Sequence, residues 1–178
     1  MVICNFGEYD FKKDISKGLE AEEYISKLIL ERDNTVLKIL PNENSKYDRM
    51  IIFKDGTFCT IEVKNDILSA KTNNVAVEIS CRGEESGVFS SEADYFVYFI
   101  REKDETKIYI IRRLKLIELI SIHKLKTVNG GDMWNGKPST KMILVPKDMF
   151  KSSCIDITNR KKYLFGIRRN LKWLQLEN

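Results

Sequence analysis

Two β-rich runs joined by a short turn constrain the fold of this chain more than any other feature. Tyr47–Phe53 and Thr57–Lys64 are rich in β-branched, aromatic and aliphatic residues, and Lys54-Asp55-Gly56 lies between them. Two such runs separated by a short segment that contains glycine are typical of a β-hairpin. We therefore expect these residues to form two neighbouring antiparallel strands.

The length of the turn decides where Asp48 lies relative to the second strand. Glu62 and Lys64 are two residues apart, so they share one face of that strand. A three-residue turn with Gly56 in the left-handed conformation places Asp48 directly opposite Glu62. A two-residue or four-residue turn would move Asp48 to the other face. We predict the three-residue turn.

Asp48 and Glu62, if opposed, form a candidate cation site. Directly opposed residues have Cβ atoms about 4.5–5.5 Å apart, and two carboxylates this close raise each other's pKa unless a cation lies between them. Mg²⁺ or Mn²⁺ binds such oxygens and keeps waters for substrate phosphates. Lys64 can then orient or deprotonate the attacking water, or stabilise charge on phosphorus. The alternative is an ordinary Glu62–Lys64 pair on an exposed sheet face.

The remaining pattern predicts a helix first, then short strands and later helices. A helix is expected over Asp14–Arg32, capped by Asp14 or Ser16. Further strands are expected at Val36–Leu40, Val75–Cys81, Tyr95–Arg101, Lys107–Ile111 and Lys141–Val145, and helices at Leu114–Lys126 and Gly166–Leu176. Residues 127–140 read as a loop. This order predicts an α/β (α+β) fold in which helices flank a central mixed β-sheet.

Composition excludes a disordered tail protein, a collagen and a coiled coil. The 178 residues suit one domain over residues 1–178, and 43% hydrophobic with 31% charged residues are ordinary globular values. The sequence has no run of 18 apolar residues, so no membrane helix is expected. The acidic Glu8 and Asp10 argue against a signal peptide. We expect a cytoplasmic protein. The cysteines are too far apart for a C-x-x-C pair, and with one histidine they predict no zinc site.

The hairpin residues resemble the PD-(D/E)xK nuclease motif. Tyr47-Asp48 is followed by Glu62-Val63-Lys64, with Glu62 fourteen positions after Asp48 and Tyr47 in place of the proline. In addition, Lys17-Gly18 followed by Glu22 resembles the first helix of archaeal-type Holliday-junction resolvases. The resemblance covers Ser16 to about Phe99. It implies a restriction-endonuclease-like core and a DNA endonuclease with one or two Mg²⁺ or Mn²⁺ ions, bound by Glu22, Asp48 and Glu62. The resemblance leaves open three finer points: selectivity for branched DNA, a homodimer, and a role in recombination or repair.

Helical geometry bears on which acidic residue of the first helix faces the site. At about 100° per residue, Glu22 and Glu20 border the apolar stripe that contains Ala21, whereas Glu23 points away from it. Glu22 is the preferred ligand and Glu20 the substitute, and Glu23 is expected to be a solvated surface residue.

Several further residues are weaker candidates. Glu78 can add a carboxylate if its strand neighbours the E-x-K strand, although a solvent-facing glutamate is the competing interpretation. Asn65 and Asp66 directly follow Lys64, so they are candidates to contact and position the site residues. Arg82 and Ser86 lie in a polar segment that can reach a phosphate, as many loops can.

Basic residues near the carboxyl end of the chain are candidate contacts to DNA. A segment over residues 160–178 contains Arg160, Lys161, Lys162, Arg168, Arg169 and Lys172. Such a run suits a phosphate backbone, or else it is the solvated face of an amphipathic helix. Trp134 can stack on a base or dock on its own domain, and His123 is expected to be structural. Two other functions stay open, a catalytically inactive DNA-binding module of the same fold and an enzyme that cleaves RNA.

Overall fold

A central mixed sheet organises the computed structural model, which describes residues 11–42, 45–102 and 105–160. Its strand order is β1 (Val36–Pro41), β2 (Arg49–Phe53), β3 (Phe58–Asp66), β6 (Tyr95–Glu102), β7 (Glu105–Arg112) and β10 (Ile155–Asp156). The neighbours β3 and β6 run parallel, while the other neighbouring pairs are antiparallel. The mixed sheet is the one that the sequence predicted.

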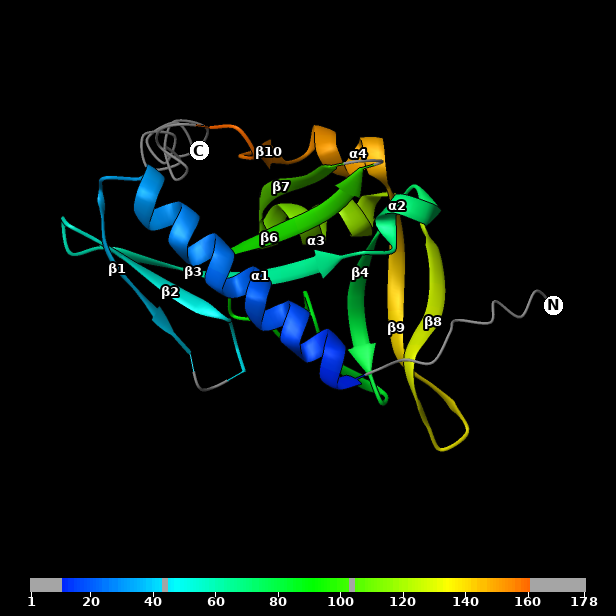
Figure 1. Cartoon of the computed structure of the whole chain (residues 1–178). Coiled ribbons are helices and arrows are strands. Elements are labelled where there is room, and N and C mark those ends of the chain that lie inside the picture. Colours follow the sequence, from blue (N-terminus) through cyan, green and yellow to red (C-terminus); the bar gives the residue numbers. More distant parts are fainter. Residues whose placement is uncertain (1–10, 43–44, 103–104, 161–178) are drawn as a thin grey trace.

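A second sheet and four helices complete the described part of the chain. The second sheet has the order β5 (Glu84–Glu85), β4 (Asn74–Cys81), β9 (Lys137–Pro146) and β8 (Lys126–Trp134). The helices are α1 (Phe11–Arg32), α2 (Ser69–Thr72), α3 (Arg113–Ile122) and α4 (Lys147–Ser152). Figure 1 shows α1 crossing the front of the central sheet and α3 behind β6 and β7. Helices therefore flank the central sheet on both faces, as expected for this α+β class.

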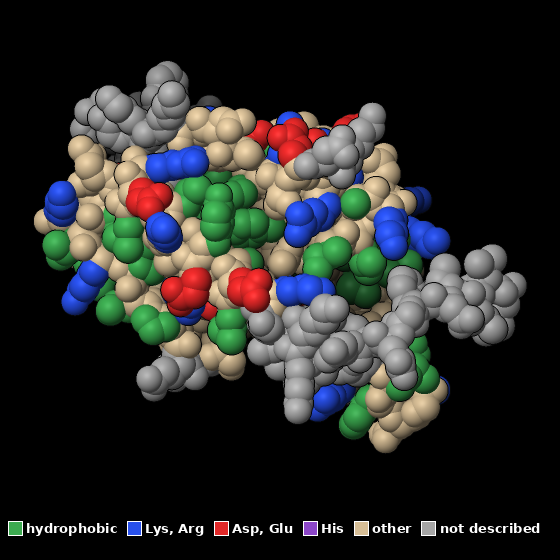
Figure 2. Space-filling model, in the orientation of Figure 1, with side chains coloured by type: hydrophobic (Ala, Val, Ile, Leu, Met, Phe, Trp, Pro, Cys, Tyr) green, Lys and Arg blue, Asp and Glu red, His purple; other side chains and the backbone are tan. Residues whose placement is uncertain are grey.

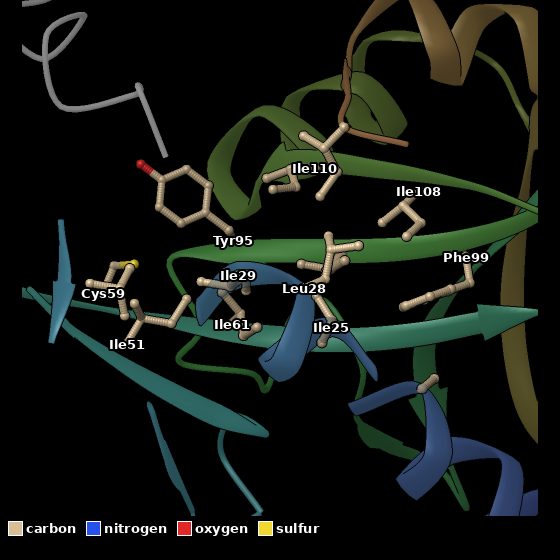
Figure 3. Close-up of a cluster of buried hydrophobic side chains, with 14 of the residues drawn as sticks. Ile25, Leu28, Ile29, Ile51, Cys59, Ile61, Tyr95, Phe99, Ile108 and Ile110 are labelled. Carbon is tan, nitrogen blue, oxygen red and sulfur yellow. The ribbon is translucent and has the colours of Figure 1, made fainter. Parts of the chain in front are cut away.

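The face of the sheet under α1 is held by an aliphatic core. Ile25 and Ile29 on the helix are fully buried, and they pack in one cluster with Ile51 on β2 and Ile61 on β3 (Figure 3). This packing follows from the helical stripe and from the strand alternation, which send these side chains to a common side. It fixes the helix that carries Glu22 against the strand that carries Glu62.

The opposite face of the central sheet forms a second core. Phe96 and Tyr98 on β6 point to this side and pack with Leu116 on α3, Phe150 on α4 and Val77 on β4. The second sheet therefore covers part of the central sheet, and it brings β4 near the side of β3 from which Glu62 and Lys64 project.

The predicted three-residue turn is confirmed. The Phe53 amide donates to the Thr57 carbonyl oxygen at 2.8 Å, and Gly56 has a φ of +84°. The register then pairs Arg49 with Ile61, so that the next pair outward is Asp48 and Glu62. A residue with a side chain is strained at this φ, and the glycine thus determines which residue faces Glu62.

Substitutions at two glycines are expected to change stability in opposite directions. Gly56→Ala places a Cβ at a left-handed position and should lower the free energy of unfolding by about 1–2 kcal/mol. Gly18→Ala lies inside α1, where an added Cβ meets nothing within 4 Å, and should raise it by about 0.5–1 kcal/mol. Urea denaturation of both variants measures the difference. Equal effects of the same sign would contradict the assigned conformations.

The structure corrects the predicted loop at residues 127–140. These residues belong to the β8–β9 hairpin, whose turn has positive φ at Asn135 (50°) and Gly136 (73°). Two positive φ values are the signature of a type I′ turn, which Asn-Gly favours. The ladder is irregular between Gly130 and Met133, so the glycines form a bulge inside a strand.

Two predicted helices differ in their limits from the observed ones. α1 begins at Phe11, so Asp14 and Ser16 lie inside the helix and not at its start. α3 ends at Ile122 and not at Lys126, because Lys126 already pairs with Leu144 in the second sheet. The helix expected at residues 166–176 lies outside the described residues.

Candidate functional site

The candidate site lies where β3 extends past the start of β2. β2 begins at Arg49, and beyond its partner Ile61 the strand β3 continues to Asp66. The Asp48 amide donates to the Ile61 carbonyl oxygen at 2.9 Å, and the Val63 amide donates to Asp48 Oδ2 at 2.6 Å. In Figure 1 this part of β3 passes behind the middle of α1. The carboxylate of Asp48 is therefore fixed to the backbone of the strand that carries Glu62 and Lys64.

Glu62 and Lys64 form a close ion pair on one face of β3. Lys64 Nζ lies 2.6 Å from Glu62 Oε1, and the Ser91 hydroxyl donates to Glu62 Oε2 at 3.5 Å. Ile61 is fully buried on the other face, as the alternation predicted. The side chain of Glu62 is only 13% exposed, so the interpretation as a pair on an exposed sheet face is wrong.

Glu22 lies at the same end of β2 and faces an arginine that sequence reasoning missed. Glu22 Oε2 is 3.0 Å from Arg49 Nη1, and Glu23 Oε1 is 3.1 Å from Arg49 Nη2. Arg49 Nη1 also donates to the Asp48 carbonyl oxygen at 3.2 Å. An arginine inside an apolar strand that faces a helix needs a carboxylate partner, and this signal could have found Arg49.

The two glutamates of the helix differ sharply in exposure. The side chain of Glu22 is 17% exposed, and that of Glu23 is 78% exposed. The predictions that Glu22 borders the apolar stripe and that Glu23 is a solvated surface residue are confirmed, although Glu23 also contacts Arg49, while the equal placement of Glu20 is not met. Glu20, the substitute candidate, is exposed on α1.

Burial, together with the neighbouring charges, shifts the pKa values of the side chains at this site. Burial is the main cause that raises the pKa of Glu22, and the negative charge of Asp48 adds to it against the effect of Arg49. Burial also raises the pKa of Glu62, with Lys64 lowering it and Asp48 raising it further. Burial alone would lower the pKa of Lys64, but Glu62 and Asp48 raise it overall. Lys64 is therefore a protonated cation at neutral pH.

The carboxylates at this site are suitable ligands for a hard divalent cation. Two of them, however, already form ion pairs with basic side chains of the protein. Carboxylate oxygens are the ligands that Mg²⁺ and Mn²⁺ prefer. Within residues 11–42, 45–102 and 105–160, however, no three His, Cys, Asp or Glu side chains are grouped to hold a metal ion. Arg49 contacts Glu22 and Lys64 contacts Glu62, so metal binding by all three acids requires Glu22 to exchange its partner.

Glu78 faces the site from the second sheet. The neighbours of β3 are β2 and β6, and β4 lies in the second sheet, so the condition that β4 neighbours the E-x-K strand is not met. The charge of Glu78 nevertheless contributes to the raised pKa of Lys64. The Ser86 hydroxyl donates to Glu78 Oε1 at 2.5 Å. Glu78 and Ser86 therefore border the site as a pair.

Asp66 and Asn65 make structural contacts. The Ser69 and Ala76 amides each donate to an Asp66 carboxylate oxygen at 3.0 Å, and Asn65 Nδ2 donates to the Lys17 carbonyl oxygen at 3.5 Å. Asp66 thus joins β3 to α2 and β4. Because both carboxylate oxygens of Asp66 accept from backbone amides, Asp66 supports the end of β3 and is not itself a candidate ligand.

The described candidate DNA contacts lie on separate elements of the fold. Arg82 is exposed, and its guanidinium lies 6.0 Å from the ring centre of the exposed Trp134. Arg160 is exposed, while Lys161, Lys162, Arg168, Arg169 and Lys172 lie outside the described residues. His123 is exposed at the end of α3. Among the described side chains, Figure 2 shows acidic and basic groups interspersed on the face that α1 covers.

Comparison with solved structures finds a partial likeness to a known protein. The fold is similar to the solved structure of a bacterial homing endonuclease, I-Ssp6803I, with 18% sequence identity and a TM-score of 0.43, over 58% of this chain and 72% of that chain. No family model matches the sequence, and no curated protein matches it. The likeness assigns no role to any residue of this chain. None of the helices in the described ranges is both long and apolar enough to cross a membrane.

The raised pKa of Glu62 predicts a pH dependence of stability in the absence of metal. A carboxyl group with a higher pKa in the folded chain binds more protons when folded. Its contribution to stability is complete below the ordinary pKa of 4.5 and is lost as the pH rises through the raised pKa. We expect wild type to gain stability relative to Glu62→Gln as the pH falls from neutral toward 4.5, measured by urea denaturation in EDTA. A relative loss over that range would contradict the prediction.

Proposed function

We propose that this chain is a DNA nuclease that hydrolyses phosphodiester bonds with Mg²⁺ or Mn²⁺. The observation that carries the proposal is the convergence of three groups, two of them on β3 and the third hydrogen-bonded to its backbone. The carboxylate of Asp48 accepts from the Val63 amide, Glu62 projects beside it, and Lys64 Nζ lies 2.6 Å from Glu62. Asp48, Glu62 and Glu22 would hold one or two ions.

The residues of the chain have separate tasks in this proposal. A bound divalent cation supplies Lewis acidity at phosphate and lowers the pKa of a water molecule. Asp48 and Glu62 would position the ion, because Asp48 is anchored to the β3 backbone and Glu62 is part of β3. Lys64 is protonated, so it donates hydrogen bonds and stabilises the negative charge that develops on the phosphate oxygens.

One observation favours the second candidate function, a catalytically inactive DNA-binding module. Arg49 and Lys64 already compensate the charges of Glu22 and Glu62. Such compensation stabilises the fold without any metal ion. In that case the acidic residues are structural, and the chain binds DNA without cutting it.

A cleavage assay with three DNA substrates separates the two functions. Purified protein is incubated with plasmid, single-stranded DNA and a four-way junction, each with Mg²⁺ or with EDTA. The nuclease proposal expects products with Mg²⁺ alone, and it expects Glu62→Ala to abolish cleavage while DNA binding persists. Binding to DNA without cleavage under any of these conditions supports the inactive module. An RNA substrate in the same panel tests cleavage of RNA.

Selectivity for branched DNA and a homodimer stay predictions that come from the resemblance of the first helix to junction resolvases. A resolvase needs two sites related by twofold symmetry. Faster cleavage of the four-way junction than of plasmid would support the first prediction. Sedimentation of the protein at twice the mass of one chain would support the second.

A further inference from the structure

We infer that Arg49 is an internal counter-ion that competes with a divalent cation for Glu22, and that Glu23 retains Arg49 when Glu22 is released. The inference rests on the proposed function and identifies what controls occupancy of the same site. It gives a role to two residues, Arg49 and Glu23, that the carboxylate motif does not include.

The charge of Arg49 requires a partner at all times. The guanidinium stays protonated at any pH that a protein tolerates, and the side chain of Arg49 is only 10% exposed. A buried charge without a partner is strongly destabilising. Glu22 could therefore not leave Arg49 for a metal ion unless another carboxylate remained in contact with the guanidinium.

Glu23 provides that carboxylate. Its Oε1 lies 3.1 Å from Nη2, while Glu22 Oε2 lies 3.0 Å from Nη1, so the two acids contact different nitrogens of one guanidinium. The side chain of Glu23 is 78% exposed, so it contacts the guanidinium from the solvent side. The Glu23 contact can persist while the Glu22 contact breaks.

A metal ion and Arg49 exclude each other at Glu22. Arg49 Nη1 also contacts the Asp48 carbonyl oxygen at 3.2 Å, so the positive charge lies at the acidic end of β2 itself. A divalent cation bound to the carboxylates of Asp48 and Glu22 would be repelled by this guanidinium. Removing the Arg49 guanidinium should therefore strengthen metal binding. Removing the Glu23 carboxylate, which holds Arg49 when Glu22 is released, should weaken it.

Calorimetric titration with Mn²⁺ tests the inference without any measurement of cleavage. We expect Arg49→Met to bind Mn²⁺ about tenfold more tightly than wild type, and Glu23→Gln to bind it about threefold more weakly. Glu31→Gln removes an equally charged, exposed glutamate that pairs with Lys27 on the same helix, and it should leave the affinity unchanged. Circular dichroism confirms that each variant is folded, and Glu23→Gln alters only an exposed side chain.

The double variant Arg49→Met/Glu23→Gln separates a specific contact from a general charge effect. If Glu23 acts through Arg49, its substitution no longer changes Mn²⁺ affinity once Arg49 is absent. An equal weakening in both backgrounds overturns the role of Glu23, and an Arg49→Met variant without tighter binding overturns the competition. If neither wild type nor any variant binds Mn²⁺, the proposed metal-dependent function fails as well, which is a distinct result.

Discussion

A Lys64→Met variant is expected to cleave DNA about 10²–10⁴ times more slowly than wild type with saturating Mg²⁺, while its affinity for DNA changes little. Methionine keeps an unbranched apolar side chain and removes the ammonium group. The loss follows from the position of Lys64, whose Nζ is held 2.6 Å from Glu62. Single-turnover cleavage rates and a filter-binding assay measure the two quantities separately.

Lys27→Met is the matched control for this prediction. Lys27 lies on α1 in a solvent-exposed pair with Glu31, so the variant loses the same charge away from the site. We expect its cleavage rate to equal that of wild type. A Lys64→Met variant that cleaves as fast as Lys27→Met would remove Lys64 from the chemistry.

Ile29→Ala should have the largest effect on stability among the changes considered. Ile29 is fully buried between α1 and the central sheet, in the cluster that contains Ile51 and Ile61. Removing its side chain leaves a cavity in a packed core and should lower the free energy of unfolding by about 2–5 kcal/mol. For a chain of this size, that corresponds to a fall in melting temperature of roughly 5–15 °C.

Leu30→Ala, one position further along the same helix, isolates the effect of burial. Leu30 is 49% exposed, so the same type of truncation should cost about 1 kcal/mol or less. Thermal unfolding of both variants provides the comparison. Equal destabilisation would mean that α1 does not pack on the sheet through this face.

Local rules predicted the hairpin because its geometry depends on neighbouring residues alone. Gly56 permits the left-handed turn, and the alternation of side chains then places Ile61 inward and Glu62 with Lys64 on the other face. The same locality placed Glu22 inward and Glu23 outward on α1. These features need no knowledge of distant parts of the chain.

Features that depend on distant pairing were missed or misplaced. The contact of Arg49 with Glu22 joins a strand to a helix 27 positions earlier, and no local pattern specifies it. β4 follows β3 in sequence but lies in another sheet, because β6 takes the parallel position beside β3. The β8–β9 hairpin carries a local signal, Asn135-Gly136, which the glycines at 130 and 131 obscured.

The proposed function requires Asp48, Glu62 and Glu22 together to bind a divalent cation. The most direct measurement is paramagnetic broadening of amide resonances in an NMR titration of isotope-labelled protein with Mn²⁺. We predict that broadening at low Mn²⁺ is centred on Asp48, Glu62 and Val63, and that it disappears in Glu62→Gln. Broadening centred elsewhere, such as on Glu102 and Glu105 of β6 and β7, or the absence of any broadening would contradict the proposal.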